Sequence, residues 1–239
     1  MDLVRLPEAR IRGLVFDIDG TLYFSGPLRS CVFASLCAAF VLRPGRTRRD
    51  LNILRPYRAA QERLRAERVL PNGEDPQAVL VARGLSLPLN EVNDVVRRWM
   101  RQAPLPYVRL CRRRGLLRRI RRWRELGVPM AVYSDYPPQD KLRRLGLDFL
   151  LDTALCSQDA EARAFKPNPR GFLAAAQRLG LPPEELVYVG DRVDVDLRGA
   201  EAAGMGWIMM QKLGRGGTPA GRAATNALDE VDRRLRNGG

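Results

Sequence analysis

The sequence predicts an α/β fold in which a three-layer αβα core surrounds a mostly parallel sheet and carries an inserted helical domain. Short apolar runs typical of buried strands alternate with helical patterns over most of the chain. Residues 26–104, after the first strand, interrupt this alternation with helical patterns alone. Polar residues follow most of the strands, and in open parallel sheets such residues meet at one edge.

The composition indicates a globular protein. The 239 residues are enough to bury a core, and 45% hydrophobic with 28% charged residues exclude a disordered or fibrous chain. The four cysteines show no CxxC spacing, and the chain has no histidine, which excludes the common histidine-containing zinc sites. We therefore expect reduced cysteines.

No targeting or membrane segment is predicted. Residues 1–13 lack the apolar stretch of a secretory signal, and we find no run of about 18 apolar residues. The apolar stretch SCVFASLCAAFVL, residues 30–42, is expected in the interior of the inserted domain, bounded by Arg29 and Arg43. We therefore expect a cytoplasmic protein.

The net charge of +14 is the unusual feature of the composition. Only Lys141, Lys166 and Lys212 are lysines, so nearly all of the positive charge is arginine spread over the whole length. This distribution indicates a compositional bias more than a nucleic-acid-binding patch, and we expect no nucleic acid partner. Transient contact with an anionic membrane or a lipid phosphate stays open, as does the choice between monomer and dimer.

The elements of the core follow from apolar runs of strand length and from helical periodicity between them. One example is the segment CRRRGLLRRIRRWREL, residues 111–126, whose apolar residues fall on one helical stripe and whose arginines occupy the other face. We therefore expect it to pack on the sheet, although an arginine-rich face could also meet an anionic surface. The expected strands span 14–18, 128–134, 149–156, 186–191 and 206–210, and the expected helices span 115–126, 138–145, 169–179 and 194–203.

The inserted domain is expected to be helical throughout. Proline and glycine stand at the joints RPG, LPNGEDP and SLPLN, which separate the helical patterns. At the other end of the chain, residues 214–239 begin Gly-rich, so we expect a flexible tail with a possible surface helix. The expected helices of the inserted domain span 28–42, 47–69, 76–83 and 88–101.

Charged and polar residues stand at the ends of the expected strands. Asp17 and Asp19 end the first strand, the pair 134–135 ends the second, and Asp191 ends the fourth, while Lys166 follows the third. Two acids at the end of a buried strand are costly unless a cation lies opposite them. The sequence therefore predicts one crevice that holds all of these groups.

Four motifs in order resemble a known family. The segments FDIDGTL, VYSD, FKPNP and YVGDRVDVDLRGAEAAGM are similar to the four signature motifs of the haloacid dehalogenase-like superfamily. The resemblance implies a Rossmann-like three-layer αβα core, formed by 1–25 and 105–213, with a parallel sheet. It also implies that residues 26–104 are an inserted helical cap domain of the C1 type.

The resemblance assigns the chemistry to a pair of acids and a metal. Asp17 is implied as the nucleophile that becomes an aspartyl phosphate, and Asp19 as the general acid and base. Because Asp19 lies near like-charged Asp17, we expect it to hold a proton that it can give to the leaving alkoxide. The metal is expected to be Mg²⁺, held by the Asp17 carboxylate, the Asp19 backbone carbonyl and Asp191.

Further residues are implied as ligands of the phosphoryl group or as supports. Arg192 and Asp135 depart from the family pattern, in which a small residue and an asparagine are common at these positions. The implied phosphate ligands are Thr21, Ser134, Asp135 and Lys166; the supporting residues are Gly20 and Asp196; the substrate pocket is expected to include Tyr23 and Phe24.

The resulting functional prediction is a magnesium-dependent phosphatase that hydrolyses a small phosphorylated metabolite. Family members that cleave carbon–halogen bonds lack an acid at the position of Asp19, so this residue points to phosphate monoesters. A phosphomutase similar to beta-phosphoglucomutase is an open alternative, because such mutases keep both acids. A second alternative is a non-catalytic module that binds polyanions or a membrane surface.

Overall fold

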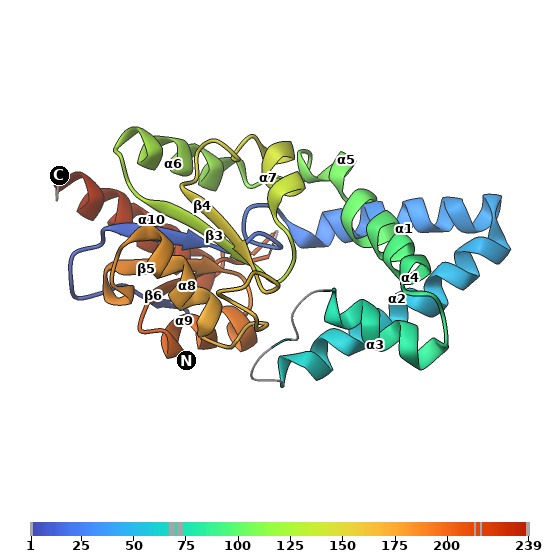
Figure 1. Cartoon of the computed structure of the whole chain (residues 1–239). Coiled ribbons are helices and arrows are strands. Elements are labelled where there is room, and N and C mark those ends of the chain that lie inside the picture. Colours follow the sequence, from blue (N-terminus) through green and yellow to red (C-terminus); the bar gives the residue numbers. More distant parts are fainter. Residues whose placement is uncertain (1, 67–69, 71–73, 213, 216, 238–239) are drawn as a thin grey trace.

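The computed structural model describes residues 2–66, 70, 74–212, 214–215 and 217–237. In this part of the chain, one sheet has the strand order β1-β6-β5-β2-β3-β4 (Figure 1). Neighbouring strands run parallel, except that β1 pairs antiparallel with β6. The strands are β1 (Val4–Arg5), β2 (Gly13–Phe16), β3 (Met130–Ser134), β4 (Thr153–Cys156), β5 (Leu186–Gly190) and β6 (Gly206–Met209).

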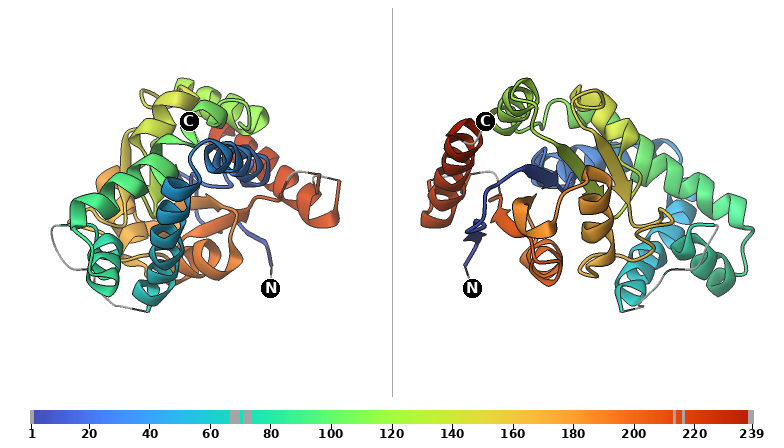
Figure 2. Two further views of the ribbon diagram at one scale, coloured as in Figure 1. Left: turned by 90° about the vertical axis from the view of Figure 1, so that its right-hand side faces the viewer. Right: turned by 60° about the vertical axis from the view of Figure 1, so that its left-hand side comes forward.

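Helices cover both faces of this sheet, which gives the expected three layers (Figure 2). On one face lie α6, α7 and α10, and on the other lie α8, α9 and the π-helical turn η3 that precedes α9. The core helices are α6 (Arg114–Glu125), α7 (Gln139–Leu145), α8 (Arg170–Leu179), η2 (Pro183–Glu185), η3 (Val193–Leu197), α9 (Arg198–Ala202) and α10 (Pro219–Asn237).

The central strand β2 shows why the sequence folds in this way. Leu14 and Phe16 pack with α6, while Val15 between them packs with α8. Every residue of β2 is buried, as expected for a parallel strand that is covered on both faces. The predicted α/β fold is confirmed, and so is the position of α6, whose Leu116, Ile120 and Trp123 are buried against the sheet.

Two features of the core differ from the sequence prediction. The short edge strand β1 was not expected. The C-terminal helix α10 is also longer and better packed than the expected surface helix, because Leu228 and Val231 lie in the core and the Asp232 carboxylate accepts hydrogen bonds from Trp123 and Arg119. Residue 213 at the end of the expected core and residues 216 and 238–239 of the expected tail lie outside the described residues.

The helices between β2 and α6 form a bundle beside the core, which we call the cap (Figure 1). Its own apolar cluster contains Ile53, Tyr57, Val92 and Val96. Expected residues 67–69 of the second helix lie outside the described residues. The cap helices are α1 (Ser25–Leu42), α2 (Pro44–Arg65), α3 (Pro76–Leu85), α4 (Leu89–Val96), the π-helical η1 (Arg97–Gln102) and α5 (Leu105–Val108).

Helix α1 overturns two expectations. It was expected inside the cap, but Leu28 is its only buried residue, and Phe33, Val41 and Leu42 are exposed. It also shows that an apolar run of membrane-spanning length does occur in this chain, since α1 is long and apolar enough by length and composition to cross a bilayer. Such a single helix is weak evidence for a membrane span.

Candidate active site

The carboxyl ends of the parallel strands meet at a cavity between core and cap. Asp17 follows β2, Ser134 ends β3 and Asp191 follows β5, and all three line the cavity. Lys166 reaches the same cavity from the loop after β4. The predicted convergence of these groups on one edge of the sheet is therefore what the structure shows.

Asp17 is fixed by the sheet itself. Its backbone N–H donates to the Val189 carbonyl at 2.9 Å, so the residue extends the pairing of β2 with β5. Its carboxylate is 9% exposed and accepts a hydrogen bond from the Lys166 ammonium. Burial raises the pKa of Asp17 well above its ordinary value, although the charge of Lys166 acts in the opposite direction.

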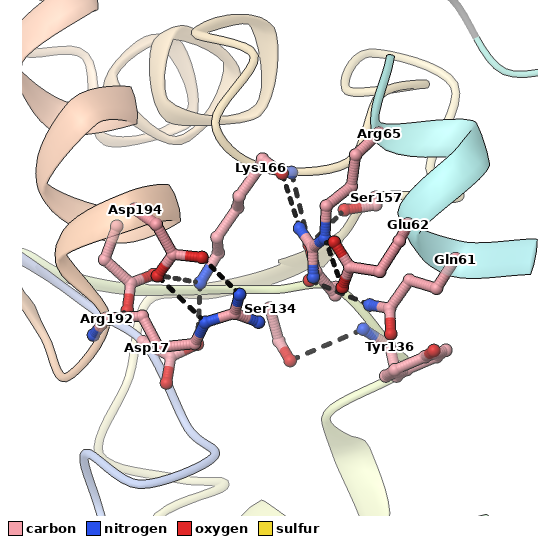
Figure 3. A network of polar contacts seen from close by, with 12 residues as sticks. Asp17, Gln61, Glu62, Arg65, Ser134, Tyr136, Ser157, Lys166, Arg192 and Asp194 are labelled. Carbon is pink, nitrogen blue, oxygen red and sulfur yellow. Dashed lines mark hydrogen bonds and ion pairs between the residues drawn. The ribbon is translucent and has the colours of Figure 1, made fainter. Parts of the chain in front are cut away.

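Lys166 provides the cation that we expected opposite the acids. Its Nζ atom lies 2.6 Å from Asp17 Oδ1 (Figure 3). It also lies 2.9 Å from Asp196 Oδ1 and 2.6 Å from the Tyr188 hydroxyl. The side chain is 2% exposed. Burial alone would lower the pKa of Lys166, but Asp17 and Asp196 outweigh it and hold the pKa well above its ordinary value.

Asp196 supports both the lysine and the loop after β5. Its Oδ2 atom accepts the backbone N–H groups of Asp191 and Arg192 at 3.1 and 3.0 Å, while Oδ1 accepts Lys166 and Tyr188. Gly190 must be a glycine here, since a Cβ would lie 2.6 Å from Asp196. Both Asp196 oxygens are thus engaged, which fits the expected supporting role.

Three acids of the site lie close enough together to fit a divalent cation. Oxygen atoms of Asp17, Asp191 and Asp196 lie within 4.8 Å of one another. Burial and the neighbouring Asp196 raise the pKa of Asp191 to about 6, and we find no hydrogen-bond donor to its carboxylate among the described residues. A hard cation would stabilise such crowded carboxylates. Because Asp196 is already saturated, Asp17 and Asp191 are the better side-chain ligands.

Gly20 shapes the turn that brings these acids together. Its φ of +99° favours glycine, and a Cβ would lie 2.0 Å from the Asp191 carboxylate. Its carbonyl accepts two hydrogen bonds from the Arg113 guanidinium, whose pKa burial lowers to about 10. Arg113 also stacks over the Phe24 ring, with 4.1 Å to the centroid.

Asp19 has a charged partner that sequence reasoning missed. Both of its carboxylate oxygens accept hydrogen bonds from Lys141 of α7, at 2.6 and 2.8 Å. The sequence analysis considered only the like charge of Asp17, so its argument for a proton on Asp19 left out an opposite charge in direct contact. Asp19 lines the cavity and is 40% exposed, as a group that meets a leaving group must be.

The other predicted ligands divide into two groups. Ser134 and Tyr23 line the cavity. Thr21 is fully buried with its hydroxyl unpartnered among the described residues, and neither Thr21 nor Phe24 lines the cavity. Asp135 does line it, but its carboxylate is already occupied.

Asp135 joins the core to the cap. Its Oδ2 atom accepts Arg65 Nη2 at 2.7 Å and Gln61 Nε2 at 3.1 Å, both from α2. Its Oδ1 atom accepts the backbone N–H of Lys166 at 3.2 Å and the hydroxyl of Ser157. Because Arg65 also donates to the Lys166 carbonyl, the two side chains hold both sides of the Lys166 backbone (Figure 3).

Comparisons with known proteins identify the family of this chain. The family model of haloacid dehalogenase-like hydrolases matches residues 11–204. A glyceraldehyde 3-phosphate phosphatase of Methanopyrus kandleri is 31% identical over 84% of this chain and 84% of its own. A phosphoglycolate phosphatase of Pectobacterium atrosepticum is 28% identical over 81% of this chain and 77% of its own.

A solved structure shares the fold at low identity. The 2-haloacid dehalogenase of Pseudomonas syringae pv. Tomato superposes with a TM-score of 0.59 and 20% identity, covering 94% of this chain and 99% of that one. Such a likeness concerns the fold alone. The family model and the curated relatives together show that the chain is an enzyme and belongs to the haloacid dehalogenase-like hydrolases.

Proposed function

We propose that this protein is a magnesium-dependent phosphatase of phosphate monoesters that acts through an aspartyl phosphate on Asp17. The contact of Asp17 with buried Lys166 carries the proposal, together with the nearby Asp191 carboxylate, which accepts no hydrogen bond from the described residues. This arrangement gathers positive charge where a phosphoryl dianion must approach a carboxylate. The phosphatases among the relatives support the same class of substrate.

In the first step, the free Oδ2 atom of Asp17 attacks phosphorus and the ester P–O bond breaks. Lys166 holds the other Asp17 oxygen and balances charge beside the phosphoryl oxygens. Asp19 gives a proton to the leaving alkoxide at the cavity wall, which requires that a proton replace the Lys141 contact on one of its oxygens. In the second step, water attacks phosphorus, Asp19 takes the proton, and the bond from Asp17 to phosphorus breaks to release inorganic phosphate.

Mg²⁺, held by Asp17, the Asp19 carbonyl and Asp191, would neutralise charge on the phosphoryl oxygens. Asp19 separates this proposal from dehalogenation, since a halide leaving group needs no proton donor. Because the fold is shared with a dehalogenase, it does not distinguish phosphate-ester hydrolysis from dehalogenation. The acid at position 19, beside the nucleophile, favours phosphate-ester hydrolysis.

The first test is release of phosphate from an aryl phosphate with Mg²⁺. Asp17→Asn should lower kcat by at least about 10³-fold, because the nucleophile is lost. Asp194→Asn is the matched control, since Asp194 is 62% exposed and pairs only with Arg192 among the described residues. EDTA should abolish the activity, and Mg²⁺ should restore it.

Two further measurements, isomerisation of a sugar phosphate and binding of polyanions, separate the alternatives. Isomerisation of a sugar phosphate without release of free phosphate would favour the phosphomutase. Tight binding of polyanions without turnover of any phosphate ester would contradict the enzymatic proposal and favour the binding module.

A further inference from the structure

The cavity between core and cap extends far beyond the catalytic acids. Its volume is about 810 Å³. Cavities of roughly 300–1,000 Å³ enclose most of a drug-sized ligand. A three-carbon phosphate, the substrate named for the curated relative from Methanopyrus kandleri, would leave most of this space empty.

One wall of the cavity is an apolar face of α1. Leu28, Val32 and Leu36 line it, and their spacing of four residues puts them on one side of the helix. Phe33 lines the cavity beside them. This wall offers carbon surface and no hydrogen-bonding side chain from these four residues.

A second apolar part of the lining comes from α4, η1 and α5, where Val96, Met100 and Leu105 line the cavity. Trp99 also lines it, but its indole N–H is already donated to Asp50 at 2.7 Å. The Tyr57 hydroxyl is likewise donated, to Asp75 at 2.6 Å. The polar groups of Trp99 and of Tyr57 from α2 are therefore already engaged within the cap.

These two walls disfavour a leaving group rich in hydroxyls. Against the apolar residues of these two walls, such a group would lose its water without gaining hydrogen-bond partners, although the lining also includes polar side chains such as Ser25, Gln139 and Tyr136. An apolar group would instead bury carbon surface against both walls, and Met100 can adapt to its shape. We propose, on the basis of the phosphatase function above, that the physiological substrate is a phosphate monoester of an apolar alcohol with an alkyl or aryl group.

Arginines at the same cavity have a different role. Arg29, Arg58 and Arg101 line it, and all three are exposed. Exposed cations at the edge of a cavity attract a phosphate dianion as it approaches. A substrate with a second anionic group is the competing interpretation of these arginines, and the experiment includes it.

The experiment compares n-alkyl phosphates from methyl to octyl, with Mg²⁺, in one phosphate-release assay. Their leaving alcohols have similar acidity, so a change in kcat/KM along the series reports binding of the chain. Each buried methylene contributes up to about fourfold in affinity. We expect kcat/KM to rise about two- to fourfold per methylene, at least about tenfold from butyl to octyl, and to exceed the values for glycerol 3-phosphate and fructose 1,6-bisphosphate.

Two variants on α1 provide a matched pair. Leu36→Gln puts an amide into the apolar wall and should flatten the rise of kcat/KM with chain length. Val41→Gln makes the same kind of change at a position that is 79% exposed and outside the cavity, and should leave the rise unchanged. Thermal melts of both variants check that each is folded.

A kcat/KM that stays flat or falls with chain length would overturn the inference, and so would a clear preference for the bisphosphate. If no phosphate ester of any kind is hydrolysed, the proposed function fails instead. Calorimetric titration with alkylphosphonates, which cannot be hydrolysed, then still decides the inference. Affinity that rises with chain length supports the apolar pocket, and affinity independent of chain length contradicts it.

Discussion

Lys166 is the residue whose role follows most directly from sequence and structure together. In a chain that uses arginine almost everywhere, a lysine before a proline indicates a place where a planar guanidinium does not fit. The structure encloses its ammonium between Asp17 and Asp196 with 2% of the side chain exposed. The ion pairs of Asp17 and Asp196 with Lys166 therefore both depend on this one ammonium group.

Lys166→Met removes the charge and keeps most of the volume. We expect kcat/KM to fall by about 10²- to 10³-fold, because a charge beside the phosphoryl oxygens is lost. The free energy of unfolding should fall by about 3–5 kcal/mol, because two buried carboxylates lose their counterion. Urea unfolding in EDTA measures this loss without a divalent ion to replace the ammonium.

Lys212→Met is the control for that substitution, since Lys212 is exposed. It should change the free energy of unfolding by less than about 0.5 kcal/mol. Equal losses in the two variants, or normal turnover by Lys166→Met, would contradict the assigned role.

Some residues of the site were not found by the sequence analysis, and they show which contacts a sequence pattern cannot predict. The scarcity of lysine that singled out Lys166 also applies to Lys141, which contacts Asp19 in the structure. Arg65 and Arg113 carry no such signal, because they are two of many arginines. Strand ends could be predicted to converge, whereas a long side chain that reaches in from a helix could not.

At the scale of elements, α2 of the cap contacts Asp135 and the Lys166 backbone through the Arg65–Asp135 ion pair and through hydrogen bonds from Arg65 and Gln61. Arg65 and Asp135 hold the two sides of the Lys166 backbone, so seating of the cap and position of the lysine are linked. The Arg65 side chain is only 8% exposed and lies over the Phe165 ring. Closure of the cap should therefore affect chemistry as well as access.

A double-mutant cycle tests this link. Arg65→Met and Asp135→Asn should each lower kcat by about tenfold or more, with a smaller change in KM. The two effects on the activation free energy should fall short of additivity by about 1–3 kcal/mol, because both variants break the same pair. Arg63→Met, an exposed arginine on the same helix, is the control.

Full additivity in that cycle, or an effect of Arg63→Met as large as that of Arg65→Met, would show that the pair does not position Lys166. Losses confined to KM would assign Arg65 to substrate binding alone.

The elements also show why a pattern of apolar residues does not determine where a helix lies in the fold. The run in α1 was expected in the cap interior, yet it lines the cavity with one face and leaves Phe33 and Val41 exposed. The helix α10 was expected in a flexible tail, yet it completes a face of the sheet. An apolar run predicts a partner surface, and only the tertiary arrangement shows which surface that is.

At the scale of the whole molecule, the chain lacks the side chain that most often titrates near neutral pH, since it has no histidine. Four of its tyrosines, three of them buried and Tyr136 half-buried, instead make the alkaline range the one in which stability changes with pH. Burial is the main cause that raises the pKa of Tyr57, Tyr133, Tyr136 and Tyr188 well above the ordinary value of about 10. Each keeps its proton in the folded state at a pH where the unfolded chain loses it.

The sign of the effect follows from proton binding. Above about pH 10 the folded state holds more protons, so the free energy of unfolding falls as pH rises, by about 1.4 kcal/mol per pH unit for each tyrosine. The four together give about 5.5 kcal/mol per pH unit. Buried Cys156, whose pKa burial raises to about 12, acts in the same direction. Below about pH 9 these tyrosines contribute no slope.

Tyr136→Phe isolates one of the four contributions. Its hydroxyl makes no hydrogen bond of ordinary geometry among the described residues and interacts only loosely with Gln77, so its removal should change the free energy of unfolding at pH 7.5 by less than about 1 kcal/mol. The variant should lose stability above pH 10 less steeply than the parent, by about 1.4 kcal/mol per pH unit. Urea unfolding between pH 8 and 11, followed together with phenolate absorbance, measures both slopes. If the free energy of unfolding of the parent stays level to pH 11, the burial of these tyrosines is contradicted. Equal slopes in parent and variant would contradict the burial of the Tyr136 hydroxyl.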